Sequence, residues 1–91
     1  METVSGSKSE DCLVLKLRGH IDSANAAPTE AEITRLRTAE PSDSIIVDCD
    51  ELEYISSAGL RVLLRLKKAV PDLRLVNVSA EVSAAGASHA F

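Results

Sequence analysis

The chain has 91 residues, 45% of them hydrophobic, and a formal net charge of −4 from 10 basic and 14 acidic side chains. The length predicts a single domain, over residues 1–91, with one modest core, and the acidic balance argues against a protein that binds the phosphate backbone of nucleic acids. The apolar runs are too short to cross a membrane, and the polar amino terminus lacks the apolar segment of a secretory signal. We therefore expect a cytoplasmic protein that neither binds nucleic acid nor inserts into membranes.

The amino-terminal segments predict two strands of unequal quality. Residues 1–9 are polar and rich in serine, so they predict a short edge strand at best and a frayed arm otherwise. Leucines alternate with other residues over residues 13–17, which is the period of a strand with one buried face. Gly19 is expected to end this strand.

A first helix is expected after this strand. Either Asp22 or Asn25 can cap it, and its first turn tolerates Pro28, because the missing proline N–H would have no partner there in any case. We expect the helix to reach about Thr38, before Pro41 breaks the pattern. Its predicted buried side chains are Ala31, Ile33 and Leu36.

A second strand and helix follow. Residues 45–48 form a short, β-branched run that is typical of a strand covered on both faces. From Leu60 onward, apolar side chains recur at helical spacing until Pro71. The expected inner face of this helix consists of Leu60, Leu63, Leu64 and Val70, and its outer stripe of Arg61, Arg65 and Lys68.

The carboxyl-terminal part adds a strand and a weak helix. Residues 73–78 predict the strand, and Ser79 begins a last helical segment that Gly86 interrupts, so residues 84–91 predict a weak or shortened final helix. Strands joined by crossover helices imply right-handed connections and a largely parallel sheet. The expected fold class is α/β, with a mixed, mostly parallel sheet of about four to five strands and helices packed against it.

Two hydroxyls stand where the second strand meets its helix, at Ser56 and Ser57. The first N–H groups of a helix have no partner within it, and a serine there most often does nothing but cap them. The same N–H groups and the helix dipole would also favour a phosphoryl group on an accessible hydroxyl. Ala58 and Gly59 favour the second interpretation, because a plain cap does not need small neighbours. They are expected to leave room for an approach to the backbone.

This junction resembles the central signature of STAS domains, the bacterial anti-sigma factor antagonists. The resemblance is carried by DCDELEYISSAGLRVLL at residues 48–64, and extends to LVLKLRGHID at residues 13–22 and LRLVNV at residues 73–78. In that family a strand ending in Asp leads to an Asp-Ser-Ser/Thr-Gly-Leu turn, and the first serine after the Asp of that turn is phosphorylated. The resemblance makes Ser57 the phosphate acceptor, while Ser56 replaces the Asp and Ala58 the second hydroxyl.

The resemblance also implies a STAS-like fold, a function and partners. It predicts an anti-sigma factor antagonist, not an enzyme, that binds an anti-sigma factor with serine kinase activity and is released when Ser57 is phosphorylated, until a serine phosphatase reverses the change. The alternative is a STAS accessory or scaffold subunit of a lipid-transport or stress-signalling complex, in which Ser57 only caps the helix. The implied neighbours of the phosphate are Asp22, Asp48, Ser56, Ala58 and Gly59, and the implied partner surface is Gly19, His20, Asp22, Asn25, Ser57 and Arg61.

The carboxylates permit two other interpretations. They could gather near Ser57 at the carboxyl edge of the sheet and hold Mg²⁺, but nothing in their spacing demands a metal, and a solvated rim is favoured. A phosphorelay receiver domain with Asp48 as its acceptor would need a longer βα alternation, and a lysine where Asn77 stands. The carboxylates concerned are Asp22, Asp48, Asp50, Glu51 and Glu53.

Enzymatic and redox functions have weak support. His20 and His89 are the only imidazoles, and the Gly-x-Ser-x-Gly elbow of serine hydrolases is absent. His20 is better interpreted as an exposed turn residue. Cys12 and Cys49 are expected to be reduced, partly buried thiols, because the chain has only two cysteines and no secretory signal. The alternative, a redox pair, is unsupported because Cys-x-x-Cys spacing is absent. We therefore expect neither a metal nor a cofactor.

Overall fold

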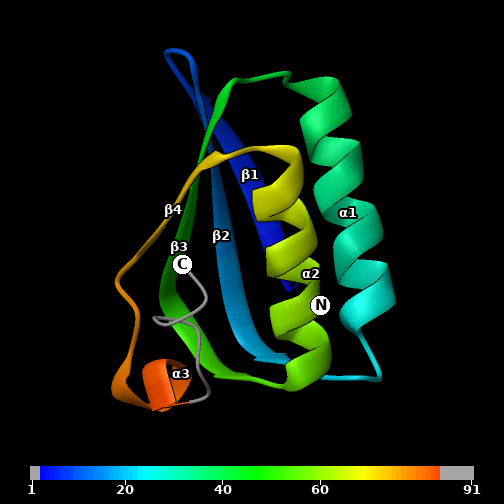
Figure 1. Ribbon diagram of the computed structural model, residues 1–91, viewed down its shortest axis with the longest axis vertical. Coiled ribbons are helices and arrows are strands. Elements are labelled where there is room, and N and C mark those ends of the chain that lie inside the picture. Colours follow the sequence, from blue (N-terminus) through cyan, green and yellow to red (C-terminus); the bar gives the residue numbers. More distant parts are fainter. Residues whose placement is uncertain (1–2, 85–91) are drawn as a thin grey trace.

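The computed structural model describes residues 3–84 and shows one four-stranded sheet with helices packed against it (Figure 1). The strands lie in the order β1-β2-β3-β4; β1 is antiparallel to β2, and the other two pairs are parallel. The predicted α/β class with a mixed, mostly parallel sheet is therefore confirmed. The elements are β1 (Val4–Ser9), β2 (Cys12–Ile21), α1 (Ala26–Ala39), β3 (Ser44–Ile55), α2 (Ser57–Ala69), β4 (Asp72–Val76) and α3 (Ala80–Ala84).

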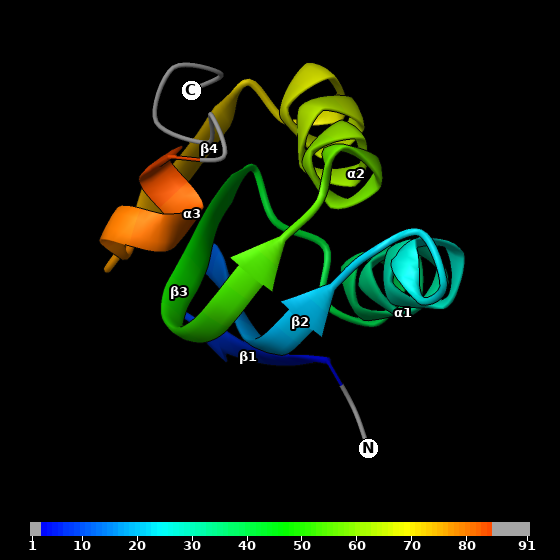
Figure 2. The ribbon, with the colours of Figure 1, turned by 90° about the horizontal axis from the view of Figure 1, so that it is seen from below.

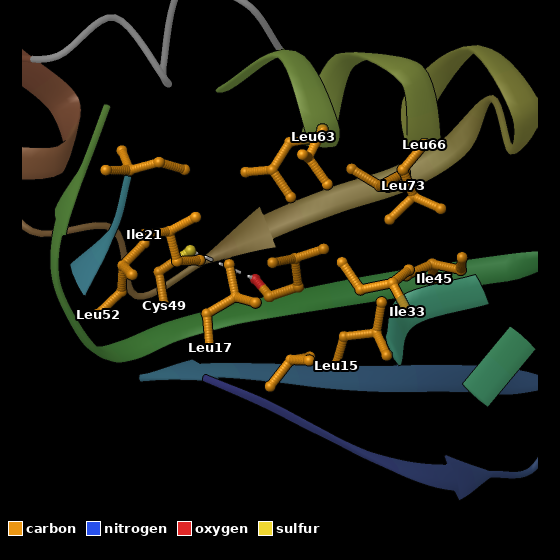
Figure 3. Close-up of a cluster of buried hydrophobic side chains, with 14 of the residues drawn as sticks. Leu15, Leu17, Ile21, Ile33, Ile45, Cys49, Leu52, Leu63, Leu66 and Leu73 are labelled. Atoms are coloured by element: carbon orange, nitrogen blue, oxygen red, sulfur yellow. Dashed lines mark hydrogen bonds between the residues drawn. The ribbon is translucent and has the colours of Figure 1, made fainter. Parts of the chain in front are cut away.

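The main core lies between the sheet and two helices. Figure 2 shows α1 and α2 side by side on one face of the sheet, whereas α3 lies apart from them beside β3. Ile46 and Asp48 alternate with the buried residues of β3 and stay only half-buried, so the prediction that this strand is covered on both faces is wrong. The inward residues, each at most 1% exposed, are Leu13, Leu15 and Leu17 of β2 and Ile45, Val47 and Cys49 of β3. Figure 3 labels Leu15, Leu17, Ile45 and Cys49 of this set, together with Leu63 and Leu66 of α2.

β3 is longer than predicted and strongly curved. Its register against β2 slips between Lys16 and Arg18, and again between Gly19 and His20. At each slip β3 contains one more residue than β2, and a β-bulge of this kind bends its strand. Figure 2 shows the resulting curl, which brings the end of β3 round to the start of α2. Gly19 lies inside β2 with a φ of 67°, so the prediction that it ends the strand is wrong.

α1 differs from the prediction in its cap and its buried face. Asn25 is the N-cap residue, but its side chain makes no capping hydrogen bond. Ile33 is buried as expected, whereas Ala31 is exposed, because residues two positions apart on a helix point in different directions. The inward position one turn before Ile33 belongs to Thr29, which is 2% exposed and shares a 2.6 Å hydrogen bond with the hydroxyl of Thr3.

α2 buries a different set of apolar residues from the one predicted. Leu63 and Val70 are buried as expected, but Leu64 is 36% exposed. The inner face follows the spacing of Gly59, Val62, Leu63 and Leu66, which turns Leu64 toward solvent. The basic stripe is exposed as predicted, at Arg61, Arg65 and Lys68.

β4 is shorter than the sequence pattern suggests, and α3 is the last element that the structure describes. β4 ends at Val76 because Asn77 takes a left-handed φ of 57°. In α3, the hydroxyl oxygen of Ser79 accepts a 3.2 Å hydrogen bond from the N–H of Val82, which is buried. Of the predicted weak segment 84–91, residues 85–91 lie outside the described part. No helix within residues 3–84 has both the length and the apolar character needed to cross a membrane.

Candidate functional site

Ser56 and Ser57 have different roles at the start of α2. Ser56 is the N-cap residue: its backbone is extended, and its Oγ accepts a 3.4 Å hydrogen bond from the N–H of Gly59. Ser57 is the first helical residue, its side chain is exposed, and its hydroxyl has no hydrogen-bond partner within residues 3–84. The capping role that accounts for most serines at such a junction therefore belongs to Ser56.

The turn that carries these serines is joined directly to the end of β2. The backbone N–H of Ser56 donates a 2.8 Å hydrogen bond to the carbonyl oxygen of Ile21. Asp22 follows Ile21, so this bond brings Asp22 close to the entry of α2. Of the two carboxylates that the sequence placed beside Ser57, the structure thus brings Asp22 to the same end of the molecule.

The loop after β2 is held by its own polar side chains. The Asn25 amide oxygen accepts from the N–H of Asp22 at 2.9 Å, and its NH₂ group donates to the carbonyl oxygen of His20 at 2.8 Å. The Asp22 carboxylate accepts from the N–H of Ala24 at 2.9 Å. Asn25 is therefore the N-cap residue of α1, one of the two predicted candidates, but its side chain and that of Asp22 hold the loop and make no capping bond to the helix.

Gly59 is required by packing. A Cβ atom at this position would lie 2.6 Å from Cγ1 of Ile55 and 2.8 Å from Cγ2 of Ile21. Both distances are shorter than any van der Waals contact, so only glycine lets α2 lie directly on the ends of β2 and β3. The prediction that Gly59 leaves room for an approach to the backbone is wrong, since it is buried, and Ala58 is half-buried against the core.

Asp48 does not belong to the turn. Because β3 continues to Ile55, Asp48 lies within the strand, and the expectation that it ends the strand is wrong. Its carboxylate accepts 3.0 Å hydrogen bonds from the side chain of Asn77 and the N–H of Asp50, and the Asn77 bond is the main cause that lowers the pKa of Asp48. Asp48 makes neither a hydrogen bond nor an ion pair with Ser57 in the part of the chain that the structure describes.

Two other acidic side chains of β3 lie near basic residues of β2. Glu51 lies 2.8 Å from Lys16 and 3.6 Å from Arg18. The hydrogen bond between Lys16 and Glu51 lowers the pKa of the carboxyl and raises that of the amine. Glu53 lies 3.8 Å from His20. Within residues 3–84, no group of three or more His, Cys, Asp or Glu side chains is arranged to hold a metal ion.

The arrangement of an exposed serine beside a capping serine can now be compared with known proteins. Residues 5–86 match the STAS domain family. The chain belongs to this family. Over 67 residues it is 39% identical to BtrV of Bordetella bronchiseptica, which is provisionally named an anti-sigma factor antagonist. That match covers 74% of this STAS domain and 57% of the relative, so the chain spans little more than half of the relative's length.

Solved structures of anti-sigma factor antagonists share the fold of this STAS domain. The protein from Mycobacterium paratuberculosis superposes with a TM-score of 0.79 at 19% identity, over 98% of this chain and 81% of that one. SpoIIAA in its unphosphorylated form gives a TM-score of 0.65 at 21% identity, over 89% of this chain and 78% of that one. At these identities the two structures show that the fold is shared.

The STAS domain exposes two side chains whose position the sequence analysis missed. Tyr54 is 49% exposed, and its ring lies edge-on to that of His20 with centroids 6.0 Å apart. His20 is a strand residue, because β2 runs to Ile21, and the prediction of a turn there is wrong. Leu64 is the second exposed large apolar side chain. The alternation of Tyr54 with the buried Ile55 is the signal that could have placed the tyrosine on the surface.

Proposed function

We propose that this STAS domain is an anti-sigma factor antagonist whose binding is switched at Ser57. In the unmodified form it binds an anti-sigma factor that is also a serine kinase. The kinase transfers the γ-phosphoryl group of ATP to Oγ of Ser57; the new O–P bond replaces the bond to ADP, and the hydroxyl proton is released. The modified protein then leaves its partner until a serine phosphatase hydrolyses the phosphoester. The domain itself acts as a cytoplasmic binding protein and not as an enzyme.

The observation that carries this proposal is the division of roles between the two serines. Ser56 already caps α2, so the hydroxyl of Ser57 is exposed and has no structural task among the described residues. A phosphoryl group there would meet the free N–H groups of the first turn and the positive end of the helix dipole. The first turn of α2 contains no acidic side chain that would oppose the added charge.

The proposed partner surface surrounds Ser57. Arg61 is exposed one turn later on the same side of α2, since residues four apart on a helix are neighbours. The loop from Gly19 to Asn25 is connected to this turn by the bond between Ile21 and Ser56. Phosphorylation would place about −1.5 to −2 charges in the middle of this surface, near Asp22, and a partner that covers it would have to desolvate them.

The test uses the purified chain, radiolabelled ATP and each anti-sigma factor kinase encoded in the same genome. Ser57→Ala is expected to abolish labelling, Ser56→Ala to retain most of it, and Ser23→Ala, an exposed serine in the neighbouring loop, to leave it unchanged. Labelling of the Ser57→Ala variant would assign the acceptor to another residue. Stable complexes without labelling by any kinase would favour the alternative, a STAS scaffold subunit that does not switch.

A further inference from the structure

A cavity of about 290 Å³ lies at the end of the sheet opposite Ser57. Leu13 and Ile45, at the starts of β2 and β3, form its inner wall, and the last turns of α1 and the following loop complete it. Figure 1 shows this end of α1 and the loop into β3, while α2 begins at the other end of the molecule. The proposed phosphorylation site and this cavity are therefore separate features.

Arg37 is the charged residue of this cavity, and it has no counter-charge. It is half-buried, and it lines both this cavity and an adjoining one of about 200 Å³ between α1 and α2. It makes neither an ion pair nor a hydrogen bond with any residue from 3 to 84, in contrast to the arginines that pair with carboxylates, namely Arg18, Arg35, Arg65 and Arg74. An anion in the cavity would supply the counter-charge that this guanidinium lacks among the described residues.

The hydroxyl groups beside Arg37 already donate hydrogen bonds to backbone carbonyl oxygens. Thr34 donates to the carbonyl oxygen of Glu30 at 3.0 Å, and Thr38 donates to that of Thr34 at 2.9 Å. Ser42 donates to the carbonyl oxygen of Glu40 at 3.2 Å. Their oxygens can therefore only accept a hydrogen bond from a ligand, which disfavours a second anionic group and favours a ligand hydroxyl.

We propose that this cavity binds a small organic anion that has one carboxylate and one hydroxyl group. The carboxylate pairs with the guanidinium of Arg37, whose planar group matches two oxygens at once. The hydroxyl donates to an oxygen of Thr38 or Ser42, and the apolar body lies against Leu13 and Pro41. The volume lies just below the range of about 300–1,000 Å³ that is usual for small-molecule sites, so it has room for a ligand of one ring.

The test is a nitrogen–proton correlation NMR titration of the full chain with three probes. 3-Hydroxybenzoate has both groups, benzoate lacks the hydroxyl, and 3-hydroxybenzamide lacks the charge. We expect saturable shifts for 3-hydroxybenzoate that centre on residues 34–45, binding of benzoate weaker by about fivefold or more, and no saturation by the amide, because a hydrogen bond to a charged group exceeds a neutral one. Arg37→Gln should weaken the binding of 3-hydroxybenzoate by about tenfold or more. Lys68→Gln, which removes a cation on the outer face of α2, should leave this affinity unchanged.

Three results would overturn the proposal: equal shifts with the acid and the amide, wild-type affinity in Arg37→Gln, or no saturation by any probe. If the spectrum of Arg37→Gln shows loss of the fold, Thr38→Val replaces it as the test. That exposed position can lose its hydroxyl without disturbing the core. Thr38→Val together with Ser42→Ala should reduce the affinity for 3-hydroxybenzoate to that for benzoate, and an unchanged preference for the hydroxylated probe would count against the assignment.

Discussion

The N–H of Ser56 and the carbonyl oxygen of Ile21 are joined by a 2.8 Å hydrogen bond. This bond continues the pairing of β2 and β3 one step past the last paired residues, Ile21 and Ile55. The side chains of Ile21 and Ile55 pack directly against Gly59 and leave no room for a Cβ atom there. The position of Ser57 is therefore determined by the core, and the loop after β2 and the start of α2 form one continuous surface.

The first prediction separates the two serines by stability. Ser56→Ala should lower the free energy of unfolding by about 0.5–1 kcal/mol, the low end of the range for a lost cap, because the capping bond is long at 3.4 Å. Ser57→Ala should change it by less than about 0.5 kcal/mol, as for other exposed positions. Urea unfolding followed by circular dichroism measures both. Equal losses would show that Ser57 shares the capping role.

The second prediction concerns Gly59. Alanine is the better helix former by about 1 kcal/mol, yet Gly59→Ala should destabilise the fold by about 1–3 kcal/mol, because its methyl group would overlap Ile55 and Ile21. Gly6→Ala is the control, since its methyl group would meet only the flexible end of Leu36 at 3.1 Å. A Gly59→Ala protein as stable as wild type would mean that α2 does not lie this close to the sheet.

The third prediction compares two adjacent leucines of α2. Leu63→Ala should cost about 2–5 kcal/mol, because Leu63 is buried and its loss leaves a cavity. Leu64→Ala should cost less than about 1 kcal/mol, because Leu64 is exposed. Denaturant midpoints of the two variants test which face of α2 is buried. Similar midpoints would show that the buried face has been assigned incorrectly.

The fourth prediction concerns the switch. Ser57→Asp, or phosphoserine at this position, should weaken binding to the anti-sigma factor by about 1–3 kcal/mol, roughly five- to 150-fold, while the circular dichroism spectrum stays unchanged. The helix terminus accommodates the charge locally, but an interface would bury it near Asp22. Titration calorimetry gives the affinity, with Ser57→Asn as the neutral control. Unchanged affinity would favour the scaffold alternative. A circular dichroism spectrum that has lost its helical signal would indicate a structural role for Ser57.

The fifth prediction concerns the buried thiol of Cys49. Burial raises the pKa of Cys49 to about 11, with a smaller contribution from the nearby charge of Asp48. The folded state therefore holds the thiol proton more tightly than the unfolded state. This contribution to stability is complete below the unfolded pKa near 9.0 and is lost as the pH rises through about 11.

Cys49→Ala provides the measurement. The variant lacks the thiol but keeps every other group that titrates in this range, so the stability difference between wild type and variant should narrow with rising pH. We expect it to shrink by about 1 kcal/mol between about pH 8 and about pH 10. A difference that stays constant over this interval would show that the thiol is not buried as described.

Local sequence patterns were enough to predict the features that depend on neighbouring residues. The alternation of Leu13, Leu15 and Leu17 located β2 and its inner face, and the helical spacing after Leu60 located α2. The pair Ser56 and Ser57 marked the junction at which the structure now shows one capping and one free hydroxyl. Periodicity and capping act over a few residues, so they can be read without the fold.

The course of β3, the need for glycine at position 59 and the cavity around Arg37 depend on packing between distant segments, and only the structure shows them. Two bulges extend and curl β3, which leaves Asp48 within the strand and away from Ser57. The close approach of Ile21 and Ile55 explains why position 59 must be glycine. From the sequence alone, Gly59 is interpreted as leaving room for an approach to the backbone. The cavity around Arg37 likewise forms only where the last turns of α1 pack beside the starts of β2 and β3. Register, bulges and cavities arise from contacts between residues far apart in the chain, and no local pattern encodes them.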